Sequence, residues 1–420
     1  MDQIYLKHAA LYEKLVQKFN DTKRPPSQKE EQRQEPGASS RELAAAGSTV
    51  VCARIRPLLD EDAAAGFPCA VYPRPAQANV VDIHDLYNHP RGRPVLKSFS
   101  YCVDALFEPE ASTEDIYDEL VADLVAFARD GGVGTLFAYG QTGSGKTFTI
   151  SQLEKLVAAA LMDWRAAGPG RRVYLTMVDL AGSSASDLLG ARGPVSVRED
   201  AAGEMRLAGA EEREVRCRDE AAELIERAAG FRRTAPTEKN GASSRSHGIA
   251  RIRITNGGSG DEDGGDGGGG DGSEGLLYLV DLAGSEGARD VATHGAERMR
   301  ETREINRSLS VLKDCIRSKA ELDKTELDKA ALPPGSARGS SSAPRVPFRE
   351  STLTKALKHV FDPAPAGRRR GRPCRTVVVA CVNPCLGDAG PSKNTLRYAE
   401  MLRGGPDEAA GRGKSRFMDF

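Results

Sequence analysis

The chain has 420 residues, of which 39% are hydrophobic and 28% are charged, and its formal net charge is −1. A chain of this length buries a sizeable core without disulfide bonds, so we expect its eight cysteines to be reduced thiols. The sequence has no apolar run of eighteen or more residues, which excludes a transmembrane helix. Its near-neutral charge does not by itself indicate a polyanionic partner.

The amino-terminal residues have the apolar spacing of a helix, with three or four positions between successive members of one face. These members are Ile4, His8, Leu11, Leu15 and Phe19, with Tyr12 and Val16 alongside. Residues 1–47 are therefore predicted to form a helix followed by a charged neck or linker. The β-branched run that starts at Ser48 marks the first strand of a globular domain at 48–403, and 404–420 is predicted to be a flexible tail.

Strand and helix patterns alternate along the globular domain. Strands are predicted at 134–139, 172–179, 249–255, 276–280 and 376–382, and helices at 114–129, 147–164, 219–227, 305–322 and 351–360. This alternation predicts an α/β fold with a central sheet. Glycine and acidic residues dominate 256–275, so this segment is predicted to be a disordered loop that expands a hairpin between two strands.

A phosphate-binding motif, G-x-x-x-x-G-K-T, lies between a predicted strand and a predicted helix. Its glycines let backbone N–H groups surround a phosphate, where the helix amino terminus adds a positive dipole. Lys146 is expected to reach the β- and γ-phosphates of ATP, and Thr147 offers a hydroxyl to Mg²⁺. The predicted nucleotide-binding residues are Gly140, Gln141, Thr142, Gly143, Ser144, Gly145, Lys146, Thr147 and Phe148.

Two segments compete to supply an aspartate on the metal side of the phosphates, MVDLAGS at 177–183 and LVDLAGS at 279–285. The second follows a segment of small and hydroxyl-bearing residues, TEKNGASSRSH, which suits a loop that closes over a γ-phosphate. We therefore predict that Asp281 is the aspartate on the Mg²⁺ side of the phosphates and that the backbone amide of Gly284 contacts the γ-phosphate. Asp179 is predicted to be structural.

Several motifs together resemble the signatures of the kinesin motor domain, in their order and spacing. These are ARIRP at 53–57, FAYGQTGSGKT at 137–147, NGASSRSH at 240–247, VDLAGSE at 280–286, VPFRESTLTKAL at 346–357 and NTLRYA at 394–399. The resemblance implies a P-loop NTPase fold, with a central, mostly parallel, mixed sheet flanked by helices on both faces. It also implies a microtubule-stimulated ATPase in which Arg54 and Pro57 border the adenine.

The resemblance assigns further roles around the phosphates. Ser243 and Ser244 would hold the attacking water and the Mg²⁺-bound water. Arg245 would pair with Glu286 when the two loops close on ATP. Such a pair makes chemical sense, because a carboxylate close to a triphosphate is unfavourable unless a cation neutralises it.

Two further segments, EREVRC at 212–217 and EINRSLSVLKDCIR at 304–317, most resemble the kinesin-13 group. That likeness implies depolymerisation of microtubule ends, with a lattice-walking motor or a microtubule-binding module without ATP cycling as alternatives. The group carries a Lys-Val-Asp loop tip. The nearest counterpart here is Val80-Val81-Asp82, which lacks the lysine.

Microtubules are acidic, so the binding face is expected to present basic side chains. By resemblance these are Lys313, Arg317, Lys319, Arg345, Arg349 and Lys355. The arginine cluster at 368–372 leaves a nucleic-acid partner as a weaker alternative. The absence of sustained heptads favours a monomer, and the expected location is the cytoplasm and its microtubules, including the spindle.

Overall fold

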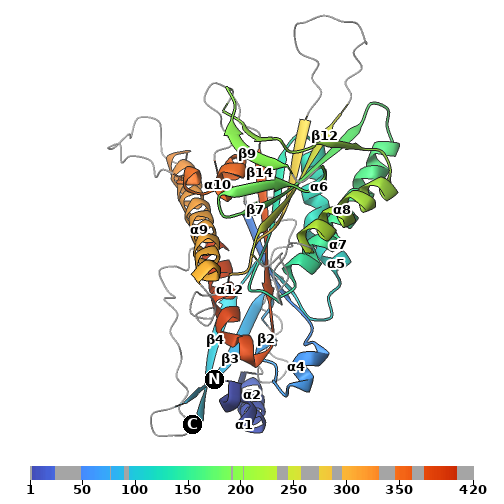
Figure 1. Cartoon of the computed structure of the whole chain (residues 1–420). Helices are drawn as coiled ribbons and strands as arrows, with labels where there is room; N and C mark the ends of the chain where they lie inside the picture. Colours follow the sequence, from blue (N-terminus) through green and yellow to red (C-terminus); the bar gives the residue numbers. More distant parts are fainter. Residues whose placement is uncertain are drawn as a thin grey trace, which may run out of the picture. The chain divides into compact units, whose positions relative to one another are not determined.

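The computed structural model (Figure 1) describes residues 2–23, 49–75, 77–88, 94–190, 193–201, 203–233, 245–256, 274–285, 296–330, 346–361 and 373–403. The chain divides into two compact units. The first comprises 1–120, 138–149 and 377–420, and the second comprises 121–137 and 150–376. The predicted tail at 404–420 lies outside the described residues, as does nearly all of the predicted linker and of the predicted glycine-rich loop.

The first unit contains a parallel pair of strands, β1 (Thr49–Ile55) and β5 (Ala105–Phe107). Beside β1 lies β14 (Cys374–Val382), which belongs to this unit from Val377 onward. All β1 residues after Thr49 are buried, as their β-branched and apolar side chains predict. The helices of this unit are α1 (Asp2–Lys7), α2 (Ala9–Lys23), α4 (Asp60–Ala64), α5 (Thr113–Ile116) and α12 (Ala389–Arg403), with a 3-10 turn η4 (Leu386–Asp388).

A second, three-stranded antiparallel sheet in the first unit has the order β2 (Val71–Pro73), β3 (Val80–Asn88), β4 (Pro94–Cys102). Asp82, in the interior of β3, is 3% exposed and accepts hydrogen bonds from Arg74 Nε at 2.8 Å and Ser100 Oγ at 2.6 Å. Asp82 is thus a buried strand residue, so the proposed counterpart of the Lys-Val-Asp tip was wrong. Residues 89–93, between β3 and β4 in the chain, lie outside the described residues.

The amino-terminal helix α2 packs on this small sheet. Tyr12 is fully buried, and its hydroxyl donates to the carbonyl oxygens of Cys69 at 3.1 Å and His84 at 3.3 Å. The ring of Phe19 meets the His84 imidazole edge-on, with centroids 4.7 Å apart. The packed face of α2 is therefore centred on the buried Tyr12 and Val16, whereas Leu11, predicted to lie on the apolar face, is 39% exposed.

The second unit is built on a mixed sheet with the order β10-β9-β8-β7-β12-β13-β6, and β11 also pairs with β7. Its strands are β6 (Val133–Tyr139), β7 (Arg172–Ala181), β8 (Ser184–Asp187), β9 (Pro194–Glu199), β10 (Met205–Ala208), β11 (Arg213–Val215), β12 (His247–Thr255) and β13 (Glu274–Asp281). Strands β12 and β13 pair antiparallel from Gly248–Asp281 to Thr255–Glu274, which confirms the predicted hairpin.

Helices cover both faces of the second unit's sheet. They are α6 (Ala122–Arg129), α7 (Lys146–Ala166, whose first turn belongs to the first unit), α8 (Arg218–Arg233), α9 (Ala296–Ala330), α10 (Thr352–Ala356) and α11 (Lys358–Phe361). Helices α7 and α8 run along one face of β7 and β12 (Figure 1). On the other face, His359 of α11 stacks on Tyr278 of β13 with centroids 4.0 Å apart.

Two predicted helices are interrupted. The helix expected at 114–129 contains a π-helical turn, η1 (Tyr117–Val121), between α5 and α6. The one expected at 351–360 breaks at Leu357 between α10 and α11. Of the helices within the described ranges, none has the length and hydropathy needed to span a bilayer.

Candidate nucleotide site

The glycine loop from Gly140 to Gly145 joins β6 to α7 and lies in the first unit. Gly140, Gly143 and Gly145 have φ angles of +155°, +77° and +95°, which side chains rarely adopt. A Cβ on Gly140 would lie 2.3 Å from the carbonyl oxygen of Cys381, so only glycine fits there. The loop thus has the backbone freedom that close approach to a phosphate requires.

Lys146, the first residue of α7, is buried against this loop. Its Nζ donates to the carbonyl oxygen of Gln141 at 2.8 Å, and Ser144 Oγ donates to the same oxygen at 2.8 Å. The loop therefore holds a lysine ammonium next to its own backbone. Thr142, Gly143 and Thr147 are exposed to solvent.

Arg54, predicted to border the base, is buried at 8% exposure in β1. Its Nη1 donates to Thr149 Oγ1 at 2.6 Å, and its guanidinium lies 5.3 Å from the centroid of the exposed Phe148 ring. Thr149 Oγ1 in turn donates to the carbonyl oxygen of Gly145 at 2.8 Å. Arg54 thus connects β1 to the first turn of α7. Pro57 is exposed just beyond β1.

In the second unit, the two aspartates that competed in the sequence lie on either side of one glycine. Asp179 of β7 and Asp281 of β13 are both paired in register with Gly248 of the intervening β12. Arg232, near the end of α8, lies over Gly248, where a Cβ would be 2.6 Å from its Nη1. Its guanidinium donates to Asp281 Oδ2 at 2.8 Å and to Asp179 Oδ1 at 3.1 Å.

Sequence reasoning missed Arg232, because the predicted helix ended at 227. The sequence did contain a signal for such a cation. Two VDLAGS segments on strands of one sheet each bring a carboxylate, and buried carboxylates require a cation as partner. Ser246 completes the group by donating from Oγ to Asp179 Oδ1 at 2.7 Å, and its carbonyl oxygen accepts from Arg232 at 3.2 Å. Asp281 and Asp179 therefore share one buried guanidinium.

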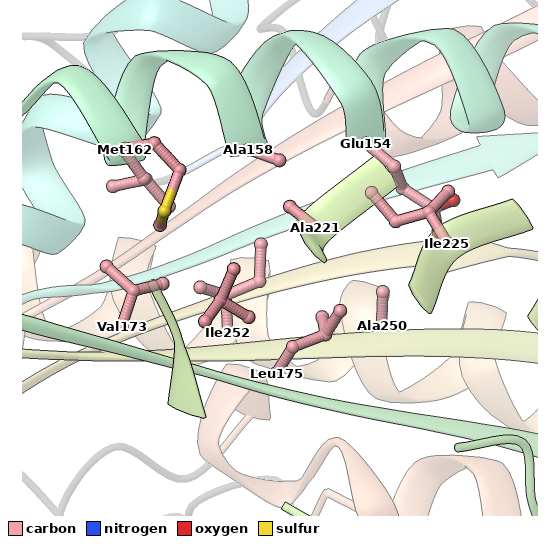
Figure 2. Close-up of a pocket in the computed structure, with 11 residues that line it drawn as sticks. Glu154, Ala158, Met162, Val173, Leu175, Ala221, Ile225, Ala250 and Ile252 are labelled. Carbon is pink, nitrogen blue, oxygen red and sulfur yellow. The ribbon is translucent and has the colours of Figure 1, made fainter. Parts of the chain in front are cut away.

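A second missed residue is Glu154, a buried carboxyl on α7. Its pKa is raised to about 8, chiefly because burial disfavours the carboxylate; the guanidinium of Arg232 opposes this rise and the carboxylate of Asp281 adds to it. Glu154 lies at one end of an apolar cavity between α7, α8 and strands β7 and β12 (Figure 2). The cavity of about 20 Å³ is the size of a water molecule, so we assign it to imperfect packing rather than to an organic ligand.

His247, the first residue of β12, links the segment after β13 to α9. Its Nδ1 accepts from the N–H of Ala283 at 3.0 Å, and its Nε2 lies 2.8 Å from Ser308 Oγ, which donates to the Ile305 carbonyl oxygen. Since Nδ1 is an acceptor, Nε2 is the protonated nitrogen of the ring. Gly284 is buried directly beyond Ala283.

The remaining predicted phosphate-site residues are only partly described. Arg245 is half-buried and precedes β12, whereas Ser243, Ser244 and Glu286 lie outside the described residues. The expected ion pair between Arg245 and Glu286 therefore stays a prediction.

The basic residues predicted to bind a polymer lie on α9 and around α10. On α9, Arg317 is exposed, while Lys313 and Lys319 are half-buried. Lys355 in α10 is also half-buried, and Arg345 lies outside the described residues. These side chains belong to the second unit.

Arg349, in the 3-10 turn η3 (Phe348–Glu350), is 57% exposed along its side chain and pairs with Glu199 of β9 at 2.9 Å. The same carboxylate accepts from the buried Lys358 of α11 at 2.7 Å. The two cations hold the pKa of Glu199 below its ordinary value, with the hydrogen bond from Lys358 contributing most. Sequence reasoning missed both Glu199 and Lys358.

The glycine loop between a buried strand and a long helix, within an α/β fold, defines a P-loop nucleotide-binding protein. A family model of the kinesin motor domain matches residues 54–404. The chain belongs to the kinesin motor-domain family.

Curated relatives fit this assignment. The chain is 30% identical over 329 residues to Kinesin-like protein KIN-13B of Arabidopsis thaliana, covering 78% of this chain and 43% of that protein. It is 31% identical over 350 residues to Diatom spindle kinesin-1 of Cylindrotheca fusiformis, covering 83% of this chain and 48% of that protein. It is 29% identical over 345 residues to Kinesin-like protein KIN-13A of Oryza sativa subsp. japonica, covering 78% of this chain and 39% of that protein. The chain thus spans less than half the length of these relatives.

A solved structure has the same fold. It is a KIF14 dimer in a two-heads-bound state, with AMP-PNP and in complex with a microtubule. The TM-score is 0.65 at 24% identity, covering 85% of this chain and 94% of that chain. This likeness confirms the predicted kinesin motor fold, a mixed central sheet flanked by helices.

Proposed function

We propose that this chain binds and hydrolyses ATP with Mg²⁺, and that microtubules stimulate this turnover. The observation that carries the proposal is the glycine loop: Gly140 closes against the Cys381 carbonyl, and Lys146 is held at the loop. A loop of this kind has the shape and charge for a triphosphate.

The residues of the loop would bind the phosphates through backbone N–H groups and the Lys146 ammonium. Thr147, Ser244 and Asp281 would hold Mg²⁺, which supplies electrophilic activation of the γ-phosphate when bound. Asp281 is the last residue of β13 and pairs with Arg232 at 2.8 Å, and a strand end is the position expected of a metal-side aspartate. The Gly284 amide would orient the γ-phosphate.

Water attack would depend on the loops that flank β12 and β13. Ser243 would position the attacking water, and Arg245 with Glu286 would close the site and exclude bulk solvent. Arg54 and Pro57 would border the base, beside the exposed Phe148 ring. These roles come from the family resemblance and the positions of the described residues.

The proposed polymer face consists of Lys313, Arg317, Lys319, Arg345, Arg349 and Lys355. Its basic character suits the acidic surface of tubulin. His247 supports coupling between nucleotide and polymer, since it connects Ala283 of the VDLAGS segment directly to Ser308 of α9. A movement of that segment would therefore act on the helix that carries part of the face.

Within this activity we favour depolymerisation of microtubule ends over walking on the lattice. Support comes from the likeness to the two KIN-13 proteins. The chain would act as a monomer in the cytoplasm on microtubules, including those of the spindle.

The test measures ATP turnover with and without stabilised microtubules, together with sedimentation of released tubulin. We expect stimulated turnover and release of tubulin, both abolished by Lys146→Ala. Lys155→Ala, an exposed lysine of the same helix that pairs with Glu226, serves as the control and is expected to act as wild type. Stimulation without release would assign the chain to lattice motors. Binding with unchanged turnover would make it a microtubule-binding module.

A further inference from the structure

Cys69 and Cys385 face one another across an isolated antiparallel β-bridge in the first unit. The N–H of Leu386 donates to the Pro68 carbonyl oxygen at 3.0 Å, and the N–H of Ala70 donates to the Pro384 carbonyl oxygen at 2.6 Å. These bonds flank the two cysteines instead of joining them. The cysteines therefore form a non-hydrogen-bonded pair, in which Cα atoms are about 4.5 Å apart and side chains are closest.

This arrangement matches the geometry of a disulfide, which requires Cα atoms about 4.4–6.8 Å apart and side chains on the same side. Each cysteine follows a proline, whose ring fixes the backbone φ angle before the bridge. The N–H of Cys385 is also held by Asn383 Oδ1 at 3.0 Å. The backbone is thus ordered for the bond while both residues are thiols.

We propose that Cys69 and Cys385 are a redox modification site, which a small-molecule disulfide such as oxidised glutathione converts to an intramolecular disulfide. The half-buried Cys69 loses its proton and attacks one sulfur of the reagent, forming a mixed disulfide and releasing one thiolate. The Cys385 thiolate then attacks Cys69 Sγ and displaces the second thiolate. Two protein thiols are oxidised, one disulfide is reduced to two thiols, and the protons pass to the released thiolates.

The surroundings favour the oxidised form once it is made. Burial raises the pKa of both thiols, so no thiolate stabilises the reduced state as it does in strongly oxidising redox proteins. The same effect makes the exchange slow at neutral pH and faster as pH rises. Cys69 Sγ donates to the Val71 carbonyl oxygen at 3.3 Å in the thiol state, so closure requires rotation of that side chain.

The disulfide would tie the start of the small sheet to the segment that leads into α12. Cys69 stands just before β2, and its carbonyl oxygen accepts from Tyr12 of α2 and from Tyr72 of β2. Cys385 immediately precedes η4 and α12. Oxidation would therefore fasten the amino-terminal helix, the small sheet and the base of α12 to one another.

The test exposes the full chain to a buffer of oxidised and reduced glutathione, blocks remaining thiols, and maps non-reduced proteolytic peptides by mass spectrometry. We expect a Cys69–Cys385 cross-linked peptide pair that dithiothreitol removes, and a higher melting temperature of the oxidised protein. Cys69→Ser and Cys385→Ser should each abolish both effects. Cys217→Ser, which removes an exposed cysteine, should retain them.

Three results would overturn the proposal: a stable glutathione adduct on Cys69 without the cross-link, a cross-link between other cysteines, or no oxidation of either residue at equilibrium. The buried Cys52 and Cys381 provide an internal comparison, because a small disulfide does not reach them in the folded chain. These readouts do not depend on ATP turnover or on tubulin.

Discussion

Arg232 and Asp281 form a buried ion pair, with 2.8 Å between Nη1 and Oδ2 and side chains that are 10% and 2% exposed. The same guanidinium reaches Asp179 across Gly248, so one cation pairs with the carboxylates of two strands. Removal of one partner from such a group leaves charges that water does not solvate.

Arg232→Ala should therefore destabilise the fold. The buried Asp281 carboxylate and the partly buried Asp179 carboxylate would lose their cation, so we expect the free energy of unfolding to fall by about 3–5 kcal/mol. Urea denaturation at pH 7 measures this. The control is Arg218→Ala on the same helix, which removes an exposed pair with Asp163 and should leave the unfolding curve as in wild type. If the two substitutions lowered the free energy of unfolding equally, the buried position of the Arg232 ion pairs would not be what stabilises the fold.

Gly140→Ala should impair the glycine loop more than Gly143→Ala. Both positions have positive φ, which costs about 1–2 kcal/mol for an L residue. Only Gly140 adds a collision, with the Cys381 carbonyl oxygen 2.3 Å from the new Cβ, whereas nothing lies within 4 Å at Gly143. We expect a larger loss of melting temperature and of affinity for a fluorescent ATP analogue in Gly140→Ala. A more severe Gly143→Ala phenotype would show that space at the Cys381 carbonyl is not the determining factor.

Glu154 should make stability depend on pH. Its pKa is about 8 in the fold and near 4.5 in the unfolded chain, so between these values the folded state binds the extra proton. Stability is then lost as pH rises through this window and levels off above it. Glu154→Gln should match wild type near pH 5 and be more stable at pH 9, by at most about 5 kcal/mol.

Denaturant unfolding of both proteins at several pH values measures this difference. Glu226→Gln, at an exposed carboxylate on α8, is the matched control and should show no pH-dependent gain. If Glu154→Gln raises the free energy of unfolding equally at pH 5 and pH 9, the carboxyl does not titrate in this window.

Tyr12 should anchor the amino-terminal helix. Tyr12→Ala removes a fully buried aromatic side chain and should cost about 3–5 kcal/mol, whereas Tyr12→Phe loses only the hydroxyl bonds to two carbonyl groups and should cost about 1 kcal/mol. Leu11→Ala, on the exposed side of α2, should have little effect. Thermal unfolding ranks the three variants. A Leu11→Ala loss as large as that of Tyr12→Ala would mean that the other face of α2 is the one that packs.

The kinesin fold and the phosphate loop could be predicted because their signals are local. A strand, a glycine loop and a helix that follow one another directly fix the spacing of Gly140 and Lys146, whatever the rest of the chain does. The apolar periodicity of residues 1–20 likewise predicted a helix, but it placed Leu11, which is 39% exposed, on the packed face and the fully buried Tyr12 only beside that face. It could not show that Phe19 of this helix packs beside His84 of the small sheet.

The sequence by itself therefore determined the elements and the motif order, and the tertiary structure decided which distant residues meet. Asp179 and Asp281 read as alternatives until the register of β7, β12 and β13 placed them on either side of Gly248. Val80–Asp82 resembled a loop tip until pairing with β4 placed it inside a strand. Strand register joins residues far apart in the chain, and a shift of one residue reverses every side chain, so no local pattern specifies such contacts.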